Sequence, residues 1–569
     1  MRTVHSKDIL LKAYLSMTKI SSKDAGLAGL SGLMLTASFS PIDLDWMAWA
    51  SLIPLLMSIE DKSSSAAFKL GLLAGLSHYL TLIYWIVVVL SHYGDINFVL
   101  SLATLFLLSL YLALYFAFFA LILVSLKKNR LSCFWGASVW VALEYARAHI
   151  MTGFPWCLLG YSQYSRVPLI QISDMAGVYS ISFVIVLVNL VLYDTLFTLL
   201  KRKTRHLWRD ERTNKFEQGL RTLLNFLTRV KSDPKPNKPR IIEIVLTSFL
   251  IGFILVYGYH NLKEKADMNS KGKRLRVVIV QGNIDQSLKW NPDFQEKTLA
   301  IYKRLSGKSV DFKPQIIIWP ETAVPLFFQD RSYLSKEVFD TAKITNSNIL
   351  FGSPAYSKDK DTIRYYNRAY MVSENRVFDY YDKVHLVPFG EYVPLKKYIP
   401  FVHRIVPAAG DFSAAKEVRP VSTPDLQIGV LICFEAIFPD ISRRFAIQGA
   451  ELLVNITNDA WFGHTSAPYQ HLSMAVFRCV ENGLPMARAA NTGISAFILP
   501  DGKIIDRSGL FVTDVLQKEI RLSHNKTFYS QFGDIFAIIA LMMTIIRFFW
   551  ILTRKWGMRL CMKQTQQKK

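Results

Sequence analysis

Long apolar segments separated by short polar gaps fill most of the first 200 residues, and they constrain the fold more than any other feature. Each is close to the roughly 20 residues that a helix needs to cross a bilayer. A spanning backbone must satisfy its own hydrogen bonds, which favours helices. We therefore expect eight transmembrane helices, at residues 25–40, 43–59, 67–91, 97–126, 131–149, 168–199, 241–259 and 531–553.

Positive charge alternates from gap to gap along these segments. Lys and Arg gather before the first segment, after the second, fourth and sixth, and after the last, whereas the alternate gaps are almost free of them. Basic loops stay in the cytoplasm. Eight spans thus place both termini in the cytoplasm and residues 262–528 on the opposite face. Much of the net charge of +23 is then a topology signal. We expect no nucleic-acid partner, because no phosphate loop, zinc knuckle or aromatic–basic platform is present.

Beyond Lys273 the pattern changes to short strands that alternate with amphipathic helices, which is typical of a layered α/β domain. We therefore divide the chain into a membrane domain (1–261), an extramembrane domain (262–528), and a last helix with a basic tail (529–569). The expected strands are Val277–Val280, Ile316–Ile318, Ile349–Phe351, Leu426–Ile432, Leu452–Asn455 and Ala496–Leu499, and the expected helices include Asp293–Leu305 and Ala467–Asn482.

The strand Leu426–Ile432 ends at Cys433, and Glu435 and a helix-like segment follow. A cysteine at such a turn has its sulfur near unpaired helix N–H groups, which favour the thiolate. Alternatively, a lone cysteine is a small buried apolar side chain. The five cysteines are scattered without a CxxC pair, so we expect neither disulfides nor a metal site, and no cofactor.

Two further strand ends carry reactive side chains. Glu321 follows the strand Ile316–Ile318, and Lys383 and Glu391 flank a turn. Singly, these residues are interpreted as a solvated acid, a surface lysine, and a helix cap or ion-pair partner. Together with Cys433 they would supply a base, a cation and a nucleophile.

In the order Glu321, Lys383, Cys433, the motifs resemble the nitrilase superfamily, whose Glu-Lys-Cys triad lies on an α-β-β-α sandwich. Residues 455–463 and 488–493 belong to the same resemblance. With the predicted spans, the whole chain resembles the apolipoprotein N-acyltransferases, the membrane-embedded branch of that superfamily. The segments that carry the narrower resemblance are Gln281–Trp290, Pro388–Pro394 and Gly153–Gln163. Phe434 departs from the pattern, since the family often has Tyr there.

The resemblance implies transfer of an acyl chain from a membrane phospholipid to the N-terminal amino group of the S-diacylglyceryl-cysteine of apolipoproteins. Cys433 would carry the acyl group as a thioester in a ping-pong reaction, with Glu321 as base and Lys383 stabilising the oxyanion. The enzyme would be a monomer in the bacterial inner membrane, with its catalytic domain on the periplasmic face. Its partners would be the phospholipid donor, the lipoprotein acceptor and the bilayer.

Supporting residues have expected roles as well. Glu391 would orient Lys383, and Glu435 would orient the site or the incoming amine. Phe434 would pack against substrate. Trp290 and Trp461 would wall an acyl tunnel or, equally well, pack in the core.

Three segments are candidates for lipid contact. Gly153–Gln163 is either an interfacial aromatic belt or a re-entrant loop at the floor of the site. Leu395–Val406 is expected to be a mobile arm in the headgroup layer, and Pro325–Phe328 to act similarly. One rival function is a membrane-tethered nitrilase-type amidase or hydrolase. Another is a transporter or receptor with an inactive domain, which the few ionisable residues in the spans disfavour.

Overall fold

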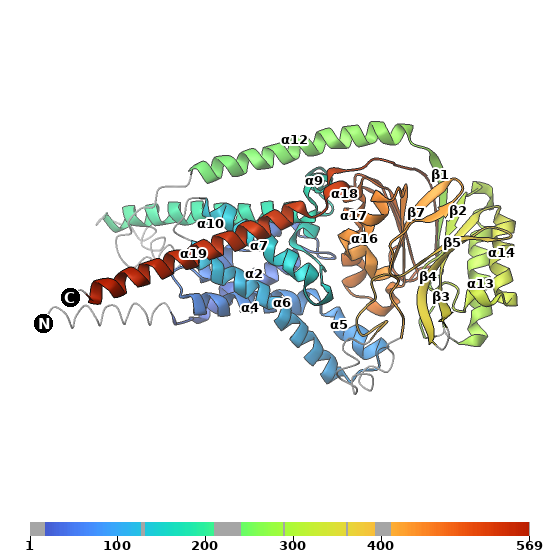
Figure 1. The fold of residues 1–569 in the computed structure, drawn as a ribbon, viewed down its shortest axis with the longest axis horizontal. Helices are drawn as coiled ribbons and strands as arrows, with labels where there is room; N and C mark the ends of the chain where they lie inside the picture. The colour runs from blue at the N-terminus through green and yellow to red at the C-terminus, as the bar shows by residue number, and fades with distance from the viewer. Residues whose placement is uncertain are drawn as a thin grey trace.

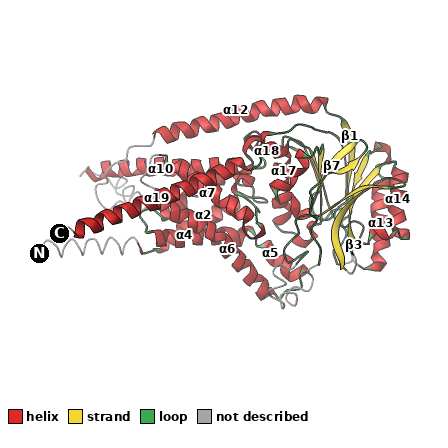
Figure 2. Ribbon diagram, viewed as in Figure 1, coloured by secondary structure: helices red, strands yellow, loops and turns green. Residues whose placement is uncertain are grey.

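The computed structural model describes residues 18–126, 131–209, 241–287, 289, 291–359, 362–392 and 411–567. It has two parts. A bundle of long helices, hereafter the helical half, comprises the described residues up to 271 together with 535–567. The strands and their covering helices, hereafter the α/β half, lie between Arg274 and Phe532 (Figure 1). Figure 2 shows that every strand lies in the second part.

The helical half is built from long helices with short helical pieces between them. The long helices are α2 (Ser22–Ala37), α4 (Ser64–Leu82), α6 (Phe98–Leu126), α7 (Ser132–His149), α10 (Val178–Arg209), α12 (Ile241–Lys271) and α19 (Ile535–Gln567). The short pieces are η1 (Asp45–Trp49), α3 (Ile53–Ser58), α5 (Trp85–Val88), η2 (Val89–Tyr93), η3 (Ile150–Thr152), η4 (Leu159–Gln163), α8 (Val167–Ile170) and α9 (Ser173–Ala176).

Three described helices are long and apolar enough to cross a membrane: Phe98–Leu126, Val178–Leu199 and Ile241–Asp267. The pair α4 and α5–η2 adds a fourth if it is a single span bent by 49°. The predicted count of eight is therefore not confirmed.

Other predicted spans also differ from the observed helices. Segment 43–59 is not one helix but η1 followed by α3, with Pro54 at the start of α3. The long helix expected from residue 168 begins only at Val178. Gly177, at φ +65, interrupts the chain just before it, because an α-helix requires negative φ.

Within the described residues, the strands of the α/β half form two six-stranded sheets. The first has the order β12-β1-β2-β3-β4-β5, and the second β11-β10-β9-β8-β7-β6. The first sheet contains β1 (Arg274–Gln281), β2 (Ile316–Ile318), β3 (Asn348–Asp359), β4 (Thr362–Val372), β5 (Val377–Asp382) and β12 (Asp514–Arg521). The second contains β6 (Val421–Thr423), β7 (Leu426–Ile432), β8 (Leu452–Thr457), β9 (Met486–Ala490), β10 (Ala496–Ile498) and β11 (Ile504–Arg507).

Alternating side chains divide the core into two layers. On β1, Val277 and Ile279 belong to a core shared with the second sheet, whereas Val278 and Val280 pack with α13 (Pro292–Gly307) and α14 (Tyr333–Thr345). Successive residues of a strand face opposite sides of a sheet, so one apolar strand serves both layers. Helices α16 (Pro439–Ile447) and α17 (Ala467–Asn482) cover the other sheet (Figure 1). The predicted α-β-β-α sandwich is confirmed.

One buried ion pair ties the two halves together. Arg478 of α17 is fully buried and lies 2.9 Å from Glu481. Its guanidinium also donates to the Tyr161 hydroxyl of η4 at 2.8 Å, and Glu481 accepts from the Val178 N–H at the start of α10. The ends of two segments of the helical half are therefore fixed to one face of α17.

Replacing Arg478 by Met is expected to destabilise the protein by about 3–5 kcal/mol, because Glu481 would keep a buried charge without its partner. The matched control is Arg444→Met, which removes the exposed i,i+4 pair with Asp440 and should cost only about 0.3–0.5 kcal/mol. Thermal unfolding in detergent compares the two variants. Equal shifts in Tm would contradict the role of this ion pair.

Candidate active site

The three residues of the predicted triad each follow a strand. Glu321 lies three residues after β2, Lys383 directly after β5, and Cys433 directly after β7. Strands β2 and β5 belong to the first sheet and β7 to the second, so the site takes groups from both layers. Lys383 is 1% exposed, Glu321 is 7% exposed, and Cys433 is half-buried.

Lys383 lies between two carboxylates. Its Nζ is 2.9 Å from Glu391 Oε1 and 3.8 Å from Glu321 Oε1. Asn367 of β4 donates to both carboxylates, at 2.8 Å to Glu321 and 2.9 Å to Glu391. Burial lowers the pKa of Lys383, but Glu391 and Glu321 raise it by more, so the side chain stays an ammonium. The expected orientation of Lys383 by Glu391 agrees with this geometry.

Backbone groups hold the two carboxylates in place. Glu321 Oε2 accepts from the Asn458 N–H at 2.9 Å, and Glu391 Oε2 accepts from the Val387 N–H at 2.8 Å. Each acid therefore has one oxygen on the backbone and one directed to Asn367. The two side chains are pre-organised rather than free to rotate.

Cys433 sits on a tight turn with φ +53, a backbone conformation that a non-glycine residue adopts only when its surroundings hold it. The following segment is a 3-10 turn, η7 (Cys433–Ile437), and the α-helix α16 starts only at Pro439. Burial and the Glu321 charge raise the pKa of the Cys433 thiol, and Lys383 opposes them. The predicted thiolate at a helix N-terminus is therefore wrong for the resting site, and the thiol needs a base.

Glu435 orients the site from inside the protein. It is fully buried. Its Oε1 accepts from the Tyr381 hydroxyl and from the N–H groups of Val384 and His385, and its Oε2 accepts from the Ile432 N–H at 2.8 Å. The two carboxylate oxygens of Glu435 thus join the turn after β5, which carries Lys383, to the end of β7, which precedes Cys433. Of its two expected roles, the geometry supports orientation of the site and not contact with an amine.

The aromatic residues expected around the site lie at different depths. Phe434 is half-buried, with its ring centroid 5.2 Å from that of Phe438. Trp461 is half-buried and makes an edge contact with Tyr93 of η2. Trp290 and the expected arm Leu395–Val406 lie outside the described residues. Within Pro325–Phe328, Phe328 belongs to the core with Phe351, so the expectation that it dips into lipid is wrong.

Two functional residues were missed from the sequence. Asn367, which joins the carboxylates, lies on the unpredicted strand β4. Lys289 is 1% exposed and donates to the Glu321 carbonyl at 3.0 Å. Burial lowers the pKa of Lys289 to about 8, against the charges of Glu321 and Cys433. The signal available was its place in Gln281–Trp290. Among the described residues, no cluster of His, Cys, Asp and Glu side chains could hold a metal ion.

The segment Gly153–Gln163 lies between the two halves and is not an exposed aromatic belt. Trp156 and Tyr161 are almost fully buried, and Trp156 donates to Gln470 of α17 at 2.7 Å. The Leu159 N–H donates to Glu144 of α7 at 2.8 Å. The belt interpretation is therefore wrong, and the segment forms the floor against which α17 packs.

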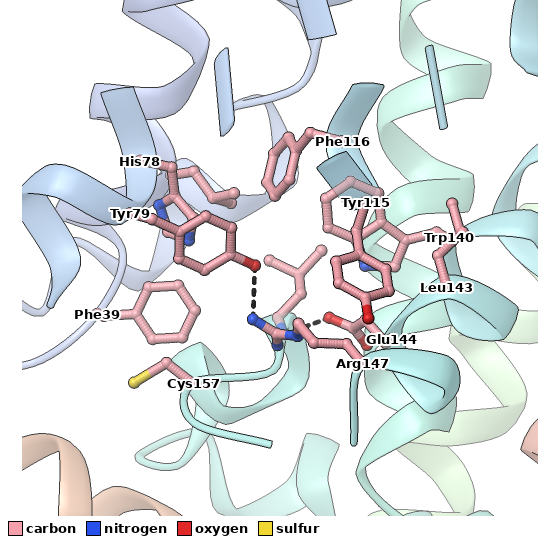
Figure 3. A pocket seen from close by; sticks show the side chains of 12 residues that line it. Phe39, His78, Tyr79, Tyr115, Phe116, Trp140, Leu143, Glu144, Arg147 and Cys157 are labelled. Atoms are coloured by element: carbon pink, nitrogen blue, oxygen red, sulfur yellow. Dashed lines mark hydrogen bonds between the residues drawn. The ribbon is translucent and has the colours of Figure 1, made fainter. Parts of the chain in front are cut away.

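A small cavity lies within the helical half, beside this floor (Figure 3). Its volume is about 20 Å³, enough for little more than one water molecule. At the wall of the cavity, Arg147 donates a hydrogen bond to the Tyr79 hydroxyl. Glu144, which also lines the cavity, accepts the hydrogen bond from the Leu159 N–H of the floor segment. It is lined by neither Cys433 nor Lys383 and is too small for a lipid substrate.

Replacing Lys383 by Met should slow alkylation of Cys433 by iodoacetamide at pH 8, by about tenfold for each unit by which the thiol pKa rises. The sign follows because Lys383 lowers the pKa of Cys433. The control is Lys303→Met, which removes a partly exposed pair with Glu337 between α13 and α14. Peptide mass spectrometry measures the rate at Cys433. Equal rates in the two variants would contradict the electrostatic role of Lys383.

Comparisons with known proteins identify the family of the chain. The model of the apolipoprotein N-acyltransferase N-terminal domain matches residues 31–191, and the carbon-nitrogen hydrolase model matches residues 276–527. The apolipoprotein N-acyltransferase of Geobacter metallireducens is 40% identical over 91% of this chain and 93% of its own length. That of Pasteurella multocida is 29% identical over 93% and 96%.

Among solved structures, an amidase from Nesterenkonia sp. is 19% identical and covers 46% of this chain and 94% of its own, with a TM-score of 0.35. The family assignment comes from the sequence relatives, which match nearly end to end across both halves. The chain belongs to the apolipoprotein N-acyltransferase family.

Proposed function

We propose that this protein transfers an acyl chain from a membrane phospholipid to the N-terminal amino group of the S-diacylglyceryl-cysteine of apolipoproteins, which completes lipoprotein maturation. The observation that carries the proposal is the 40% identity to an apolipoprotein N-acyltransferase over 91% of the chain. The buried Glu321–Lys383–Cys433 arrangement supports it, because acyl transfer through a thiol requires a base, a cation and a nucleophile.

In the first half-reaction, Glu321 accepts the proton of the Cys433 thiol while the sulfur attacks the ester carbonyl of the phospholipid. The raised pKa of the thiol makes this base necessary. Lys383 stabilises the negative oxygen of the tetrahedral intermediate, a contribution of about 3 kcal/mol for one such donor. The C–O bond then breaks, the lysophospholipid oxygen takes the proton back from Glu321, and a thioester remains.

In the second half-reaction, the amine of the diacylglyceryl cysteine attacks the thioester carbonyl. Glu321 accepts the amine proton, and Lys383 again stabilises the oxyanion. The C–S bond breaks, the sulfur recovers the proton, and an amide is released. Because the first product leaves before the second substrate reacts, the kinetics are ping-pong.

The supporting residues act on the orientation of the three reacting groups. Glu391 Oε1 lies 2.9 Å from Lys383 Nζ and holds that side chain in place. Asn367 donates to Glu321 Oε1 at 2.8 Å and orients the carboxylate. Lys289 holds the Glu321 backbone, and Glu435 links the turns that carry Lys383 and Cys433. A misplacement of about 1 Å can cost about 100-fold in rate. Phe434, Trp461 and Trp290 are proposed to face the acyl chains.

The location of both substrates in lipid explains the apolar helices. We place the protein in the bacterial inner membrane, with the α/β half on the periplasmic face and both termini in the cytoplasm. The support is the charge alternation along the sequence and the three apolar helices. The other function that the fold allows is hydrolysis, in which water takes the acyl group.

Incubation with phospholipid alone should raise the intact mass of the protein by one acyl group, and hydroxylamine should remove the added mass. Cys433→Ala is the control and should show no increase. Addition of a diacylglyceryl peptide should then restore the free enzyme and yield the N-acyl peptide. Absence of the adduct would contradict the thioester mechanism, and release of free fatty acid alone would favour the hydrolase.

Membrane-impermeant maleimide should label a cysteine introduced at Asp311, an exposed residue of the α/β half, in intact spheroplasts. It should not label a cysteine at Lys563, in the basic tail, until the membrane is permeabilised. The opposite pattern would reverse the proposed orientation.

A further inference from the structure

The peptide of Cys433 is held by side chains from other elements. Its carbonyl accepts from His471 Nε2 at 3.2 Å and from Asn455 Nδ2 at 3.4 Å. Because Cys433 has φ +53, its turn persists only if outside contacts stabilise it. His471 lies on α17 and is fully buried. The sulfur position therefore depends on a helix that is remote in sequence.

The surroundings of His471 favour a proton on Nε2. Nε2 faces the Cys433 carbonyl, which can only accept, whereas Nδ1 lies 3.1 Å from Nη2 of Arg488, which can only donate, and 3.2 Å from Asp459 Oδ1. Arg488 is itself paired with Asp459 at 2.7 Å. Burial and the Arg488 charge lower the pKa of His471, which keeps the ring neutral. The proton is then on Nε2, the nitrogen that faces the Cys433 carbonyl.

The preceding residue, Gln470, is bound to the helical half. Its Oε1 accepts from Trp156 Nε1 at 2.7 Å and from Trp85 Nε1 at 3.2 Å, and its Nε2 donates to the Leu82 carbonyl at 3.1 Å. Leu82 ends α4 and Trp85 begins α5, so Gln470 contacts both sides of the 49° bend. The Trp156 ring also packs on His471, with 5.9 Å between centroids.

Gln470 and His471, which are consecutive in α17, therefore contact the α4–α5 bend and the Cys433 peptide, respectively. We propose that His471 is a positioning residue for Cys433, and that Gln470 couples it to the α4–α5 bend. The helical half thereby sets the reactivity of the thiol in addition to anchoring the enzyme. The inference rests on the proposed function for its kinetic readout, but reactivity of Cys433 toward a small alkylating reagent reports on it independently.

The first experiment compares three variants of His471 in the full-length protein. Gln can place an amide N–H where Nε2 lies, Asn reaches only the Nδ1 position, and Phe keeps the ring without a donor. His471→Phe and His471→Asn should lower kcat of thioester formation by about 10- to 100-fold at unchanged KM. They should also slow alkylation of Cys433. His471→Gln should restore most of both rates.

The second experiment tests the coupling to the bend. Trp85→Phe removes the N–H that reaches Gln470 but retains an aromatic ring against Trp156 and Phe462. The matched control is Trp49→Phe, which removes a comparable indole hydrogen bond to Gln163 at 3.1 Å that involves no residue of α17. Trp85→Phe should lower kcat and slow alkylation of Cys433 several-fold, and Trp49→Phe should do neither.

The outcomes separate the claims. Equal kcat and alkylation rates for His471→Asn and His471→Gln would overturn the positioning role, even if His471→Phe does not fold. Equal behaviour of Trp85→Phe and Trp49→Phe would overturn the coupling. If the unsubstituted protein forms no thioester, the proposed function fails, while the alkylation rates still decide both points.

Discussion

The ammonium of Lys383, buried at 1% exposure, is the charge on which the rest of the site depends. A buried cation is costly unless opposite charges and hydrogen bonds surround it. Glu391 and Glu321 supply those charges, and Asn367 holds the two carboxylates toward the same nitrogen. Burial and the Glu321 charge raise the pKa of the Cys433 thiol, which favours a neutral thiol before substrate arrives. The role that we propose for Lys383 is to stabilise the developing oxyanion.

The sandwich places this site close to the helical half. The second sheet, which carries Cys433, is covered by α17, and α17 contacts the floor segment Gly153–Gln163 (Figure 1). Arg478, Gln470 and His471 lie along this one helix and contact η4, the α4–α5 bend and the Cys433 carbonyl, respectively. Helix α17 therefore both joins the α/β half to the helical half and supports the turn that carries Cys433.

Strongly apolar segments were predictable from sequence. Strands Ile316–Ile318 and Leu426–Ile432 and helix Ala467–Asn482 agree with the structure to the residue. The two strands are short, nearly continuous apolar runs, which are typical of buried strands. Strands β4 and β5 were not predicted, since β4 is exposed at its start and its residues Thr362–Val372 are mostly polar or aromatic. Strand β4 pairs with β3, and β5 pairs with β4, and sequence periodicity does not reveal these pairings.

The sequence located the candidate residues Glu321, Lys383 and Cys433 but not the electrostatics of their surroundings. Glu321 and Cys433 each follow a short apolar strand, which is a local signal, whereas Lys383 follows the unpredicted and partly exposed strand β5. The raised thiol pKa and the inward role of Glu435 arise from groups up to 112 residues apart along the chain, such as Glu321 and Cys433. Similarly, length and hydropathy located the apolar segments but did not show where Gly177 and Pro54 interrupt the helices.

The most direct test of the account is the infrared spectrum of the acyl-enzyme formed from phospholipid with a ¹³C-labelled acyl carbonyl. Donors aimed at the carbonyl oxygen lower its stretching frequency relative to the same thioester in water. We predict one labelled thioester band at lowered frequency, which returns toward the solution value in Lys383→Met. A thioester band at the solution frequency that Lys383→Met does not move would contradict the claim that this ammonium lies at the reacting carbonyl.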